Sequence, residues 1–443
     1  MMKDTIKCTF LGDVMCKSEL IETFRSETGF DFQEMFSNIS PFLKQSDLVF
    51  ANLETPISLD NSVLTTEKFC FNSPYEFAKA AKEAGIDVVA TANNHCLDRG
   101  IDGIKSTIDS LNKIGFIHTG IFDEKQRDHV IIKKNGIRFG FLSYTYGTNA
   151  FSNNQYLKKK ERWKVNLFQN QELSNPVDRF FYYHRNSIIA KVYNRIVEKL
   201  CPGQISKPIY EHREFDFHCK KKIKRDIASL KKKGADIVIM YMHAGGQYNN
   251  EATKYTKQLS KWLSNAGVDW IIGSHEHVVH GGVFSDISNG KIIAYSLGNF
   301  DGITGVYENP MDKMSEYSVA LNVYVDKNLV INKATLQNVI GTFGIYNANG
   351  ELTTEAIENV LLFIPLMFLW LWAVEKHELT FLKTVSFSFK NALLCSFLIE
   401  MAQLLFRVGQ VQISDLVYNT LGGITGGVCY WIVILAKKKV KQK

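Results

Sequence analysis

Five segments of the chain share one pattern, in which an apolar run rich in β-branched residues passes directly into polar residues. They are residues 6–15 (IKCTFLGDVM), 47–54 (DLVFANLE), 87–95 (DVVATANNH), 236–246 (DIVIMYMHAGG) and 269–277 (DWIIGSHEH). Continuous apolar runs of this length are typical of strands that are buried on both faces of a sheet. The pattern therefore predicts five core strands, each with polar residues at its carboxyl end.

Helical patterns separate these strands. Residues 75–85, 103–115 and 253–267 place apolar side chains at helical spacing and end on glycine, which is a common helix terminator. The alternation of strand and helix predicts an α/β domain with largely parallel pairing. Further strands are predicted at residues 137–145, 291–300 and 318–325.

A basic and aromatic insertion at about residues 150–220 interrupts the alternation. Between Lys158 and Lys233 the chain holds 20 Lys and Arg against 8 Asp and Glu, whereas the net charge of the whole chain is only +7. Either this segment is a solvated surface insertion, or it binds an anionic partner such as lipid head groups, phosphates or a polyanion. Its helical part, within residues 179–200, is either an interfacial membrane helix or a packed surface helix.

The chain becomes strongly apolar beyond a polar linker at residues 346–358. Three apolar segments follow, at residues 359–374, 385–406 and 416–436. A membrane-spanning helix needs about 20 residues, so the first of them is short. We predict one α/β domain over residues 1–345 and an all-α transmembrane domain over residues 359–443.

The charges around the apolar segments predict their orientation. The C-terminal tail, KKKVKQK, carries five lysines and is expected in the cytoplasm. Three spans then place the N-terminal domain outside the cell, although its first residues lack the apolar run of a signal peptide. We expect a multi-pass protein of the cell membrane with an extracytoplasmic N-terminal domain.

Polar residues recur inside the apolar segments. Glu400 and Gln403 lie three residues apart, and Asp415 and Asn419 four apart, so each pair shares a helix face. They form either an intramembrane polar site or ties between helices. The eight cysteines include no CxxC pair, which argues against a zinc ribbon or a thioredoxin-type site.

Side chains capable of chemistry gather at the predicted strand ends, where α/β sheets bind ligands. In chain order they are Asp13, Asn52, Glu54, Asn93, Asn94, His95, His243, His275 and His277. Carboxylate, amide oxygen and imidazole are ligands for Mn, Fe or Zn. One such Asp alone would be explained as a helix cap and one such His as a hydrogen-bonded residue. Five strand ends of this kind in order favour a metal site.

The series resembles the metallophosphoesterase pattern and, more closely, the CapA family of poly-γ-glutamate capsule synthesis proteins. The matching pieces are GDVM, ANLETPI, ANNHCLDRGIDGIKSTIDSLNKIG, HAGGQY, GVDWIIGSHEHVV and IAYSLGNF, in the family's order over residues 6–340. The resemblance implies a four-layer sandwich of two mixed β-sheets that pack face to face and are flanked by helices.

The resemblance also implies roles for residues, with one or two bound Mn, Fe or Zn ions that activate a water. Asp13 and His277 would hold one ion, and Glu54 would bridge to a second. Asn94, His243 and His275 would hold that second ion. His95 would protonate the leaving group, and Asp98 would either orient His95 through a hydrogen bond or cap the next helix.

Three positions depart from the family pattern. Met15 stands where metallophosphoesterases carry a histidine, and Ala244 and Gln247 stand where CapA relatives carry a tryptophan and a glutamate. Two functions therefore stay open. The chain is a membrane-anchored, metal-dependent hydrolase in the synthesis or export of a surface polymer, or it is an inactive scaffold or polymer-binding subunit of a membrane assembly.

The C-terminal part resembles the VanZ-like family in LLFIPLMF, SFLIEMAQLLF and ISDLVYNTLGGITGG. That resemblance implies envelope chemistry but no particular reaction. The expected partners are an anionic surface polymer or a phosphoester substrate, the membrane, and other capsule-synthesis membrane proteins. No nucleic acid is expected, because the sequence holds no recognition-helix or base-stacking motif.

Overall fold

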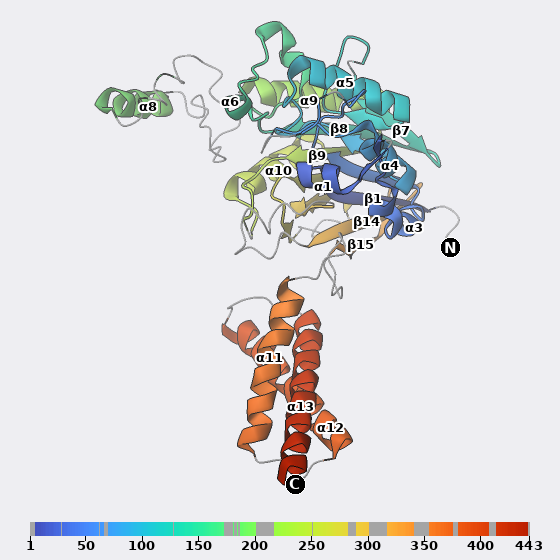
Figure 1. Cartoon of the computed structure of the whole chain (residues 1–443). Helices are drawn as coiled ribbons and strands as arrows, with labels where there is room; N and C mark the ends of the chain where they lie inside the picture. Colours follow the sequence, from blue (N-terminus) through green and yellow to red (C-terminus); the bar gives the residue numbers. More distant parts are fainter. Residues whose placement is uncertain are drawn as a thin grey trace. The chain divides into compact units, whose positions relative to one another are not determined.

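The computed structural model divides the chain into two compact units, Met1–Ile340 and Gly341–Lys443 (Figure 1). The structure describes residues 5–27, 29–61, 63–65, 70–126, 128–171, 180, 184, 187–200, 217–249, 251–281, 289–300, 317–340, 354–374, 380–406 and 413–441.

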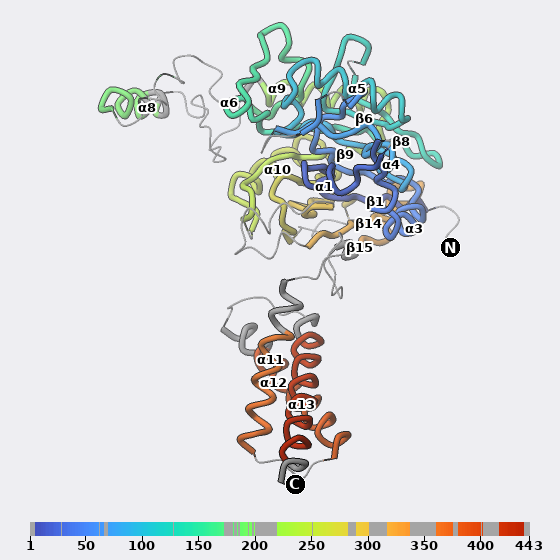
Figure 2. The backbone as a smooth tube through the Cα atoms, viewed as in Figure 1, coloured from blue at the N-terminus to red at the C-terminus, as the bar shows by residue number. Residues whose placement is uncertain are grey.

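The first unit contains a six-stranded mixed sheet with the strand order β15-β14-β1-β4-β5-β6. Its strands are β1 (Thr5–Val14), β4 (Leu48–Leu53), β5 (Val88–Ala90), β6 (Ile117–Thr119), β14 (Ser318–Asp326) and β15 (Ile331–Ile340). Strands β1, β4, β5 and β6 run parallel, while β14 is antiparallel to β1 and β15. The backbone trace shows β14 beside β1 although the two are far apart in sequence (Figure 2).

A second, five-stranded sheet has the order β12-β10-β9-β8-β7. Its strands are β7 (Val130–Lys134), β8 (Ile137–Thr145), β9 (Ile237–His243), β10 (Trp270–Ser274) and β12 (Ile292–Ala294). All neighbours are parallel except β7 and β8. The predicted largely parallel pairing is therefore confirmed, with antiparallel strands at one edge of each sheet.

The two sheets pack face to face through an apolar core. Phe10 of β1 stacks on Phe50 of β4 at a ring distance of 4.9 Å, and it meets the edge of Trp270 of β10 at 5.8 Å. Successive strand residues point to opposite faces, so Leu11 lies in the outer core of the first sheet. Each sheet is thus apolar on both faces, as the continuous apolar runs predicted.

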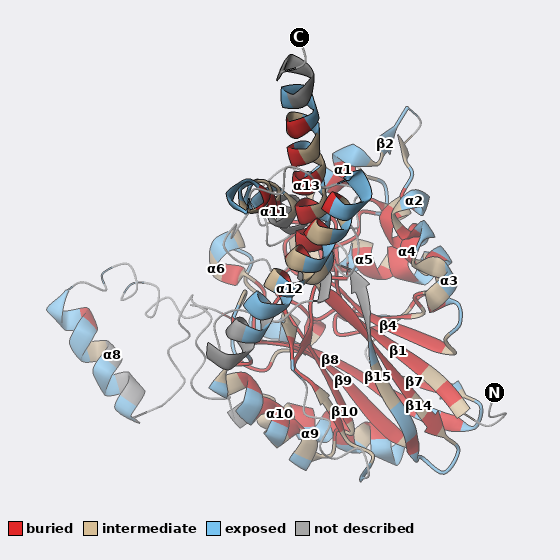
Figure 3. Ribbon diagram, turned by 90° about the horizontal axis from the view of Figure 1, so that it is seen from below, coloured by how far each residue is buried: buried red, intermediate tan, exposed pale blue. Residues whose placement is uncertain are grey.

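Helices cover the outer faces and complete four layers. The first sheet is covered by α1 (Ser18–Thr23), α2 (Gln33–Ser37), α3 (Ser40–Leu43), α4 (Tyr75–Ala84) and α5 (Gly100–Ile114), and the second by α9 (Phe217–Lys232) and α10 (Lys254–Ala266). Figure 3 shows the buried strands of the first unit between helices that are exposed on one side. The predicted four-layer sandwich of two mixed sheets flanked by helices is confirmed.

One predicted strand is divided in two. Residues 291–300 form β12 in the second sheet and then β13 (Ser296–Leu297), which pairs with β11 (Val279–His280). The chain leaves the sheet where Tyr295 passes over Gly273, so closely that a Cβ at Gly273 would lie 1.8 Å from the Tyr295 carbonyl oxygen. This crossing carries the following residues toward the end of β1.

The predicted insertion contains several short described elements. They are α6 (Ala150–Asn153), a 3-10 helix at Lys159–Lys164 and α8 (Ile188–Leu200). Val165 and Leu167 form β-bridges with Ile121 and Thr145, so this part of the segment belongs to the sandwich. A small hairpin, β2 (Arg25–Ser26) and β3 (Gly29–Phe30), lies outside the two main sheets.

The second unit consists of α11 (Thr354–Ala373), α12 (Phe381–Phe406) and α13 (Ile413–Lys441). Within it, Phe381–Ile399 and Leu416–Lys437 are long and apolar enough to cross a membrane, and Val360–Ala373 is shorter. Two of the three predicted spans therefore meet this criterion among the described residues. The criterion rests on length and composition alone.

Glycines let α13 pack closely on both neighbouring helices. A Cβ at Gly422 would lie 2.3 Å from the Val360 carbonyl oxygen of α11, and a Cβ at Gly423 would lie 2.3 Å from the Ala392 Cβ of α12. Asn419 donates to the Ser396 hydroxyl at 2.9 Å, which is a tie between α12 and α13. The side chains of Glu400, Gln403 and Asp415 lie outside the described residues.

We predict that Gly12→Ala destabilises the first unit. Gly12 lies in β1 where β13 crosses, and a Cβ there would stand 1.8 Å from the Gly298 carbonyl oxygen. Because a backbone atom cannot move aside as a side chain can, we expect a loss of about 1–3 kcal/mol. Thermal unfolding of the full chain in detergent measures it. The control is Gly281→Ala, whose added Cβ would meet nothing within 4 Å among the described residues, and equal melting of both variants would contradict the prediction.

Candidate metal centre

The first half of the site is formed where β1 and β4 end side by side. Asp13 and Asn52 are register partners in the parallel pairing, so their side chains meet. Asp13 Oδ1 accepts a hydrogen bond from Asn52 Nδ2 at 2.7 Å, and its Oδ2 accepts one from the backbone N–H of His275 at 3.1 Å. Asp13 therefore joins both sheets at this edge.

Glu54 follows β4 and is completely buried. Its Oε2 accepts a hydrogen bond from Asn52 at 3.3 Å. Its Oε1 accepts none in the described part of the chain but lies 3.6 Å from His243 Nε2 and 3.9 Å from His277 Nε2. Burial, and then the nearby charge of Asp13, raise the pKa of Glu54 well above its ordinary value.

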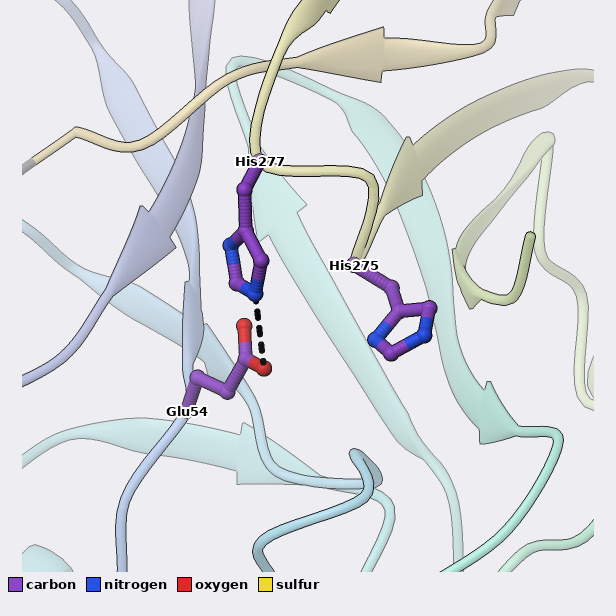
Figure 4. A group of neighbouring side chains, drawn as sticks. All are labelled: Glu54, His275 and His277. Atoms are coloured by element: carbon purple, nitrogen blue, oxygen red, sulfur yellow. Dashed lines mark ion pairs between the residues drawn. The ribbon is translucent and has the colours of Figure 1, made fainter. Parts of the chain in front are cut away.

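The second sheet supplies three histidines. His243 ends β9 beside Ser274 of β10, and His275 and His277 follow β10 directly. Figure 4 shows His277 above the Glu54 carboxylate with His275 beside it. His275 and His277 have φ angles of 93° and 59°, which are unfavourable for residues with a Cβ and are concentrated at functional sites.

Two groups of these side chains have the spacing of metal ligands. One contains Glu54, His275 and His277, the other Asp13, Glu54 and His243, and the ligand atoms within each group lie within 4.8 Å of one another. All are buried, and both groups share Glu54. Two carboxylates and three imidazoles enclosed together fit a divalent ion of the Mn, Fe or Zn type, and Glu54 Oε1 is a buried oxygen that such an ion would satisfy.

Asn94 lies against the second of these groups. Its Oδ1 is 2.8 Å from His243 Nε2, and its Nδ2 donates to Asn149 Oδ1 at 3.4 Å. That second bond turns the Asn94 oxygen, rather than its nitrogen, toward the site. Burial, followed by the neighbouring imidazoles of His275 and His277, holds the pKa of His243 well below its ordinary value, so His243 is neutral as a ligand must be.

Hydrogen bonds fix which nitrogen of His277 faces the site. Its Nδ1 donates to Asn299 Oδ1 at 2.8 Å, which leaves Nε2 to face Glu54. Outer partners of this kind orient ligating histidines. Sequence analysis did not assign a role to Asn299, although it lies in the segment IAYSLGNF, which carries the resemblance.

His95 and Asp98 form a buried pair beside the ligand groups. Their Nδ1 and Oδ2 atoms are 2.7 Å apart. The Asp98 carboxylate also accepts hydrogen bonds from the Phe71 N–H at 2.7 Å and from the Asn153 amide. Helix α5 begins after Arg99 with no side-chain cap. Asp98 therefore contacts His95, and of the two predicted roles the geometry favours orientation.

The three departures from the family pattern also lie at or beside the site. Met15 and Ala244 are buried, and Gln247 Nε2 lies 3.3 Å from His277 Nε2. The ring of Tyr146 lies 4.7 Å from the ring of His275 and covers that side of the site. An uncharged amide thus stands beside the candidate ligand atom of His277 where the family pattern has a carboxylate.

Two protein families match two successive parts of the chain. The family described as bacterial capsule synthesis protein PGA_cap matches residues 7–302, and the VanZ/LLP1 family matches residues 304–435. Protein VanZ of Enterococcus faecium is 32% identical over 114 residues, which are 24% of this chain and 65% of VanZ.

Two relatives share the first part of the chain. Capsule biosynthesis protein CapA of Bacillus anthracis is 28% identical over 302 residues, which are 67% of this chain and 60% of that protein. PGA biosynthesis protein CapA of Bacillus subtilis is 25% identical over 301 residues, 67% of this chain and 63% of that protein. The chain thus spans about three fifths of the length of these relatives.

Among solved structures, the calcineurin-like phosphoesterase YfkN from Bacillus subtilis is similar to this chain. The alignment covers 79% of this chain and 93% of YfkN, with 12% identity and a TM-score of 0.34. A likeness of this size adds nothing to the fold that the strand order itself defines.

We predict that Glu54→Gln removes most of the bound metal. Glu54 is the carboxylate that both ligand groups share, and glutamine keeps its shape without its charge. After dialysis of the full chain against Mn²⁺, elemental mass spectrometry is expected to find at least tenfold less metal in this variant.

Glu276→Gln is the matched control. Glu276 lies between two of the site histidines, but its oxygens accept hydrogen bonds from the Gly246 N–H and the Thr256 hydroxyl. Burial raises its pKa to about 8, and neither ligand group contains it, so the substitution leaves both groups intact. Equal metal content in both variants would contradict the prediction.

Proposed function

The chain belongs to the family of bacterial capsule synthesis proteins, and from this premise we propose that its first unit is a metal-dependent hydrolase. It acts in the biosynthesis or export of a capsule or other surface polymer of the poly-γ-glutamate type. One observation carries the proposal: two buried ligand groups share Glu54 beside the His95–Asp98 pair. The bond cleaved is a phosphoester, or an acyl or amide bond.

The ligand groups define where the reacting bond is held. The residues that would hold one or two Mn, Fe or Zn ions are Asp13, Glu54, Asn94, His243, His275 and His277. When bound, such ions would supply Lewis-acid activation of water and would offset negative charge. Asn52 holds Asp13 and Glu54 in place from one amide nitrogen, and Asn299 holds His277. The buried setting strengthens every charge interaction with an anionic substrate.

His95 acts as the proton donor to the leaving group. Its Nδ1–H donates to the Asp98 carboxylate, which orients the ring and leaves Nε2 as the atom from which a proton passes to the leaving group. Phe71 and Asn153 hold Asp98 by hydrogen bonds from two other segments. The imidazole is thereby fixed before any substrate binds.

The second candidate function is a scaffold or polymer-binding subunit without catalysis. The observation that favours it is the amide of Gln247, which approaches the ligand atom of His277 in place of a carboxylate. Met15 removes a further ligand that the related pattern contains. A polymer-binding subunit could retain a metal ion yet hydrolyse nothing, so the activity measurement below separates the two functions.

We propose further that the second unit attaches the protein to the membrane. The VanZ-like match and the two apolar helices of sufficient length support this. The five lysines of the tail favour a cytoplasmic C-terminus and an extracytoplasmic first unit, and the protease accessibility of that unit in intact cells tests this orientation. Other membrane proteins of capsule synthesis are its proposed partners.

We predict that His95→Gln separates metal binding from catalysis. The full chain in detergent should hydrolyse bis(p-nitrophenyl) phosphate with Mn²⁺, and the variant should keep its metal but lose about 10²–10⁴-fold in kcat. Asp98→Asn should lower kcat less, with KM unchanged. The control is His184→Gln, because that imidazole is exposed and bonds locally to Phe180.

Two outcomes would contradict this account. If His95→Gln kept the wild-type kcat, His95 would not be the acid. If the wild-type chain held metal but hydrolysed no phosphoester or γ-glutamyl amide, the scaffold function would replace the hydrolase.

A further inference from the structure

Helix α8 (Ile188–Leu200) exposes its apolar side chains. The exposed fractions are 81% for Ile188, 72% for Ile189, and 51% for both Val192 and Ile196, whereas Ala190 is buried. A surface helix of a globular protein normally buries its apolar face and exposes its polar one. Contiguous apolar side chains that remain exposed are typical of an interaction site.

The apolar residues form a row that runs along the helix. Ile188, Val192 and Ile196 follow one another at four-residue steps, which places them above one another on a single face. Three exposed basic residues, Lys191, Arg195 and Lys199, also follow one another at four-residue steps. Their row is offset by one residue from the apolar row, since Lys191 precedes Val192 and Arg195 precedes Ile196. The two rows therefore lie next to each other, apolar beside basic.

We propose that α8 lies on an anionic lipid surface. Its isoleucine and valine side chains would enter the boundary between head groups and acyl chains, while the basic row contacts the negatively charged head groups. An apolar face flanked by Lys and Arg is the pattern of helices that lie in the membrane interface. The long stems of Lys and Arg allow the charges to stay in water while the helix is partly immersed.

Charge distinguishes an anionic lipid surface from a second copy of the chain as the occupant. The segment from Lys158 to Lys233 holds 20 basic against 8 acidic residues, so two copies of it would repel each other. The chain also contains two helices that are long and apolar enough to cross a bilayer. A 13-residue helix is marginal in water by itself, so α8 needs an apolar surface to persist. This inference rests on the proposed membrane attachment and not on the proposed hydrolase activity.

Amide hydrogen exchange of the full chain tests the proposal. The peptide covering α8 is compared in detergent micelles, in phosphatidylcholine nanodiscs, and in nanodiscs that contain phosphatidylglycerol as well. We expect its exchange to slow by at least tenfold with phosphatidylglycerol, and to stay fast in micelles with or without inorganic phosphate. Exchange in α10, which packs on the second sheet, should be the same in all samples.

Two variants test the two rows. The apolar-row variant combines Ile188→Ser, Val192→Ser and Ile196→Ser. The basic-row variant combines Lys191→Gln, Arg195→Gln and Lys199→Gln. Each variant should abolish the slowing of exchange in α8. The matched control neutralises three exposed lysines of α9, by Lys221→Gln, Lys224→Gln and Lys232→Gln, and should leave it intact. All replaced residues are exposed, so unchanged exchange in α10 confirms that the variants fold.

Three outcomes would overturn the proposal. The first is fast exchange of α8 in the presence of phosphatidylglycerol. The second is slow exchange that is already present in micelles and rises with protein concentration, which would identify a second copy as the occupant. The third is slowing by phosphatidylglycerol that either row variant retains.

Discussion

The structure of the site depends on how two carboxylates, those of Asp13 and Glu54, are held in the buried interior. Asp13 and Glu54 are fully buried at one edge of the sandwich, and both lie close to imidazoles. Burying such charges without compensation is costly. The raised pKa of Glu54, caused first by burial and then by Asp13, expresses this cost. A divalent ion bound among these residues would offset that cost, which is the physical reason for proposing a metal site here.

The arrangement of the sheets brings these groups together. Strands β1, β4 and β5 end at one edge of the first sheet, and β9 and β10 end at one edge of the second, so parallel pairing alone aligns each set. The two edges are joined by the Asp13–His275 hydrogen bond and by the crossing of β13 over β1. Gly12 and Gly273 allow the crossings because each stands where a Cβ would strike a carbonyl oxygen. The path of the backbone, as well as the identity of the side chains, therefore brings the candidate ligand groups together.

Much of this could be predicted from the sequence, because the signal is local. An apolar run followed by a polar end marks the strand and the polar residues at its carboxyl end, which is why Asp13, Glu54, Asn94 and the three histidines could be expected at one edge of the sandwich. Their role as metal ligands stays a prediction. The resemblance to capsule synthesis and VanZ-like families is confirmed by the family matches. Asn149, Asn153 and Asn299 could not be predicted, since their contacts form only when distant segments meet. The interfacial and packed alternatives for α8 could not be separated either, because periodicity defines a helix face but not what covers it.

The most direct test locates metal in the protein. Crystals of the full chain grown with Mn²⁺ should give anomalous difference density at the manganese absorption edge. The account predicts one or two peaks at coordination distance, roughly 2.0–2.3 Å, from the oxygens of Glu54 and the imidazoles of His243, His275 and His277. Strong manganese density elsewhere in the protein, with none among these side chains, would contradict it.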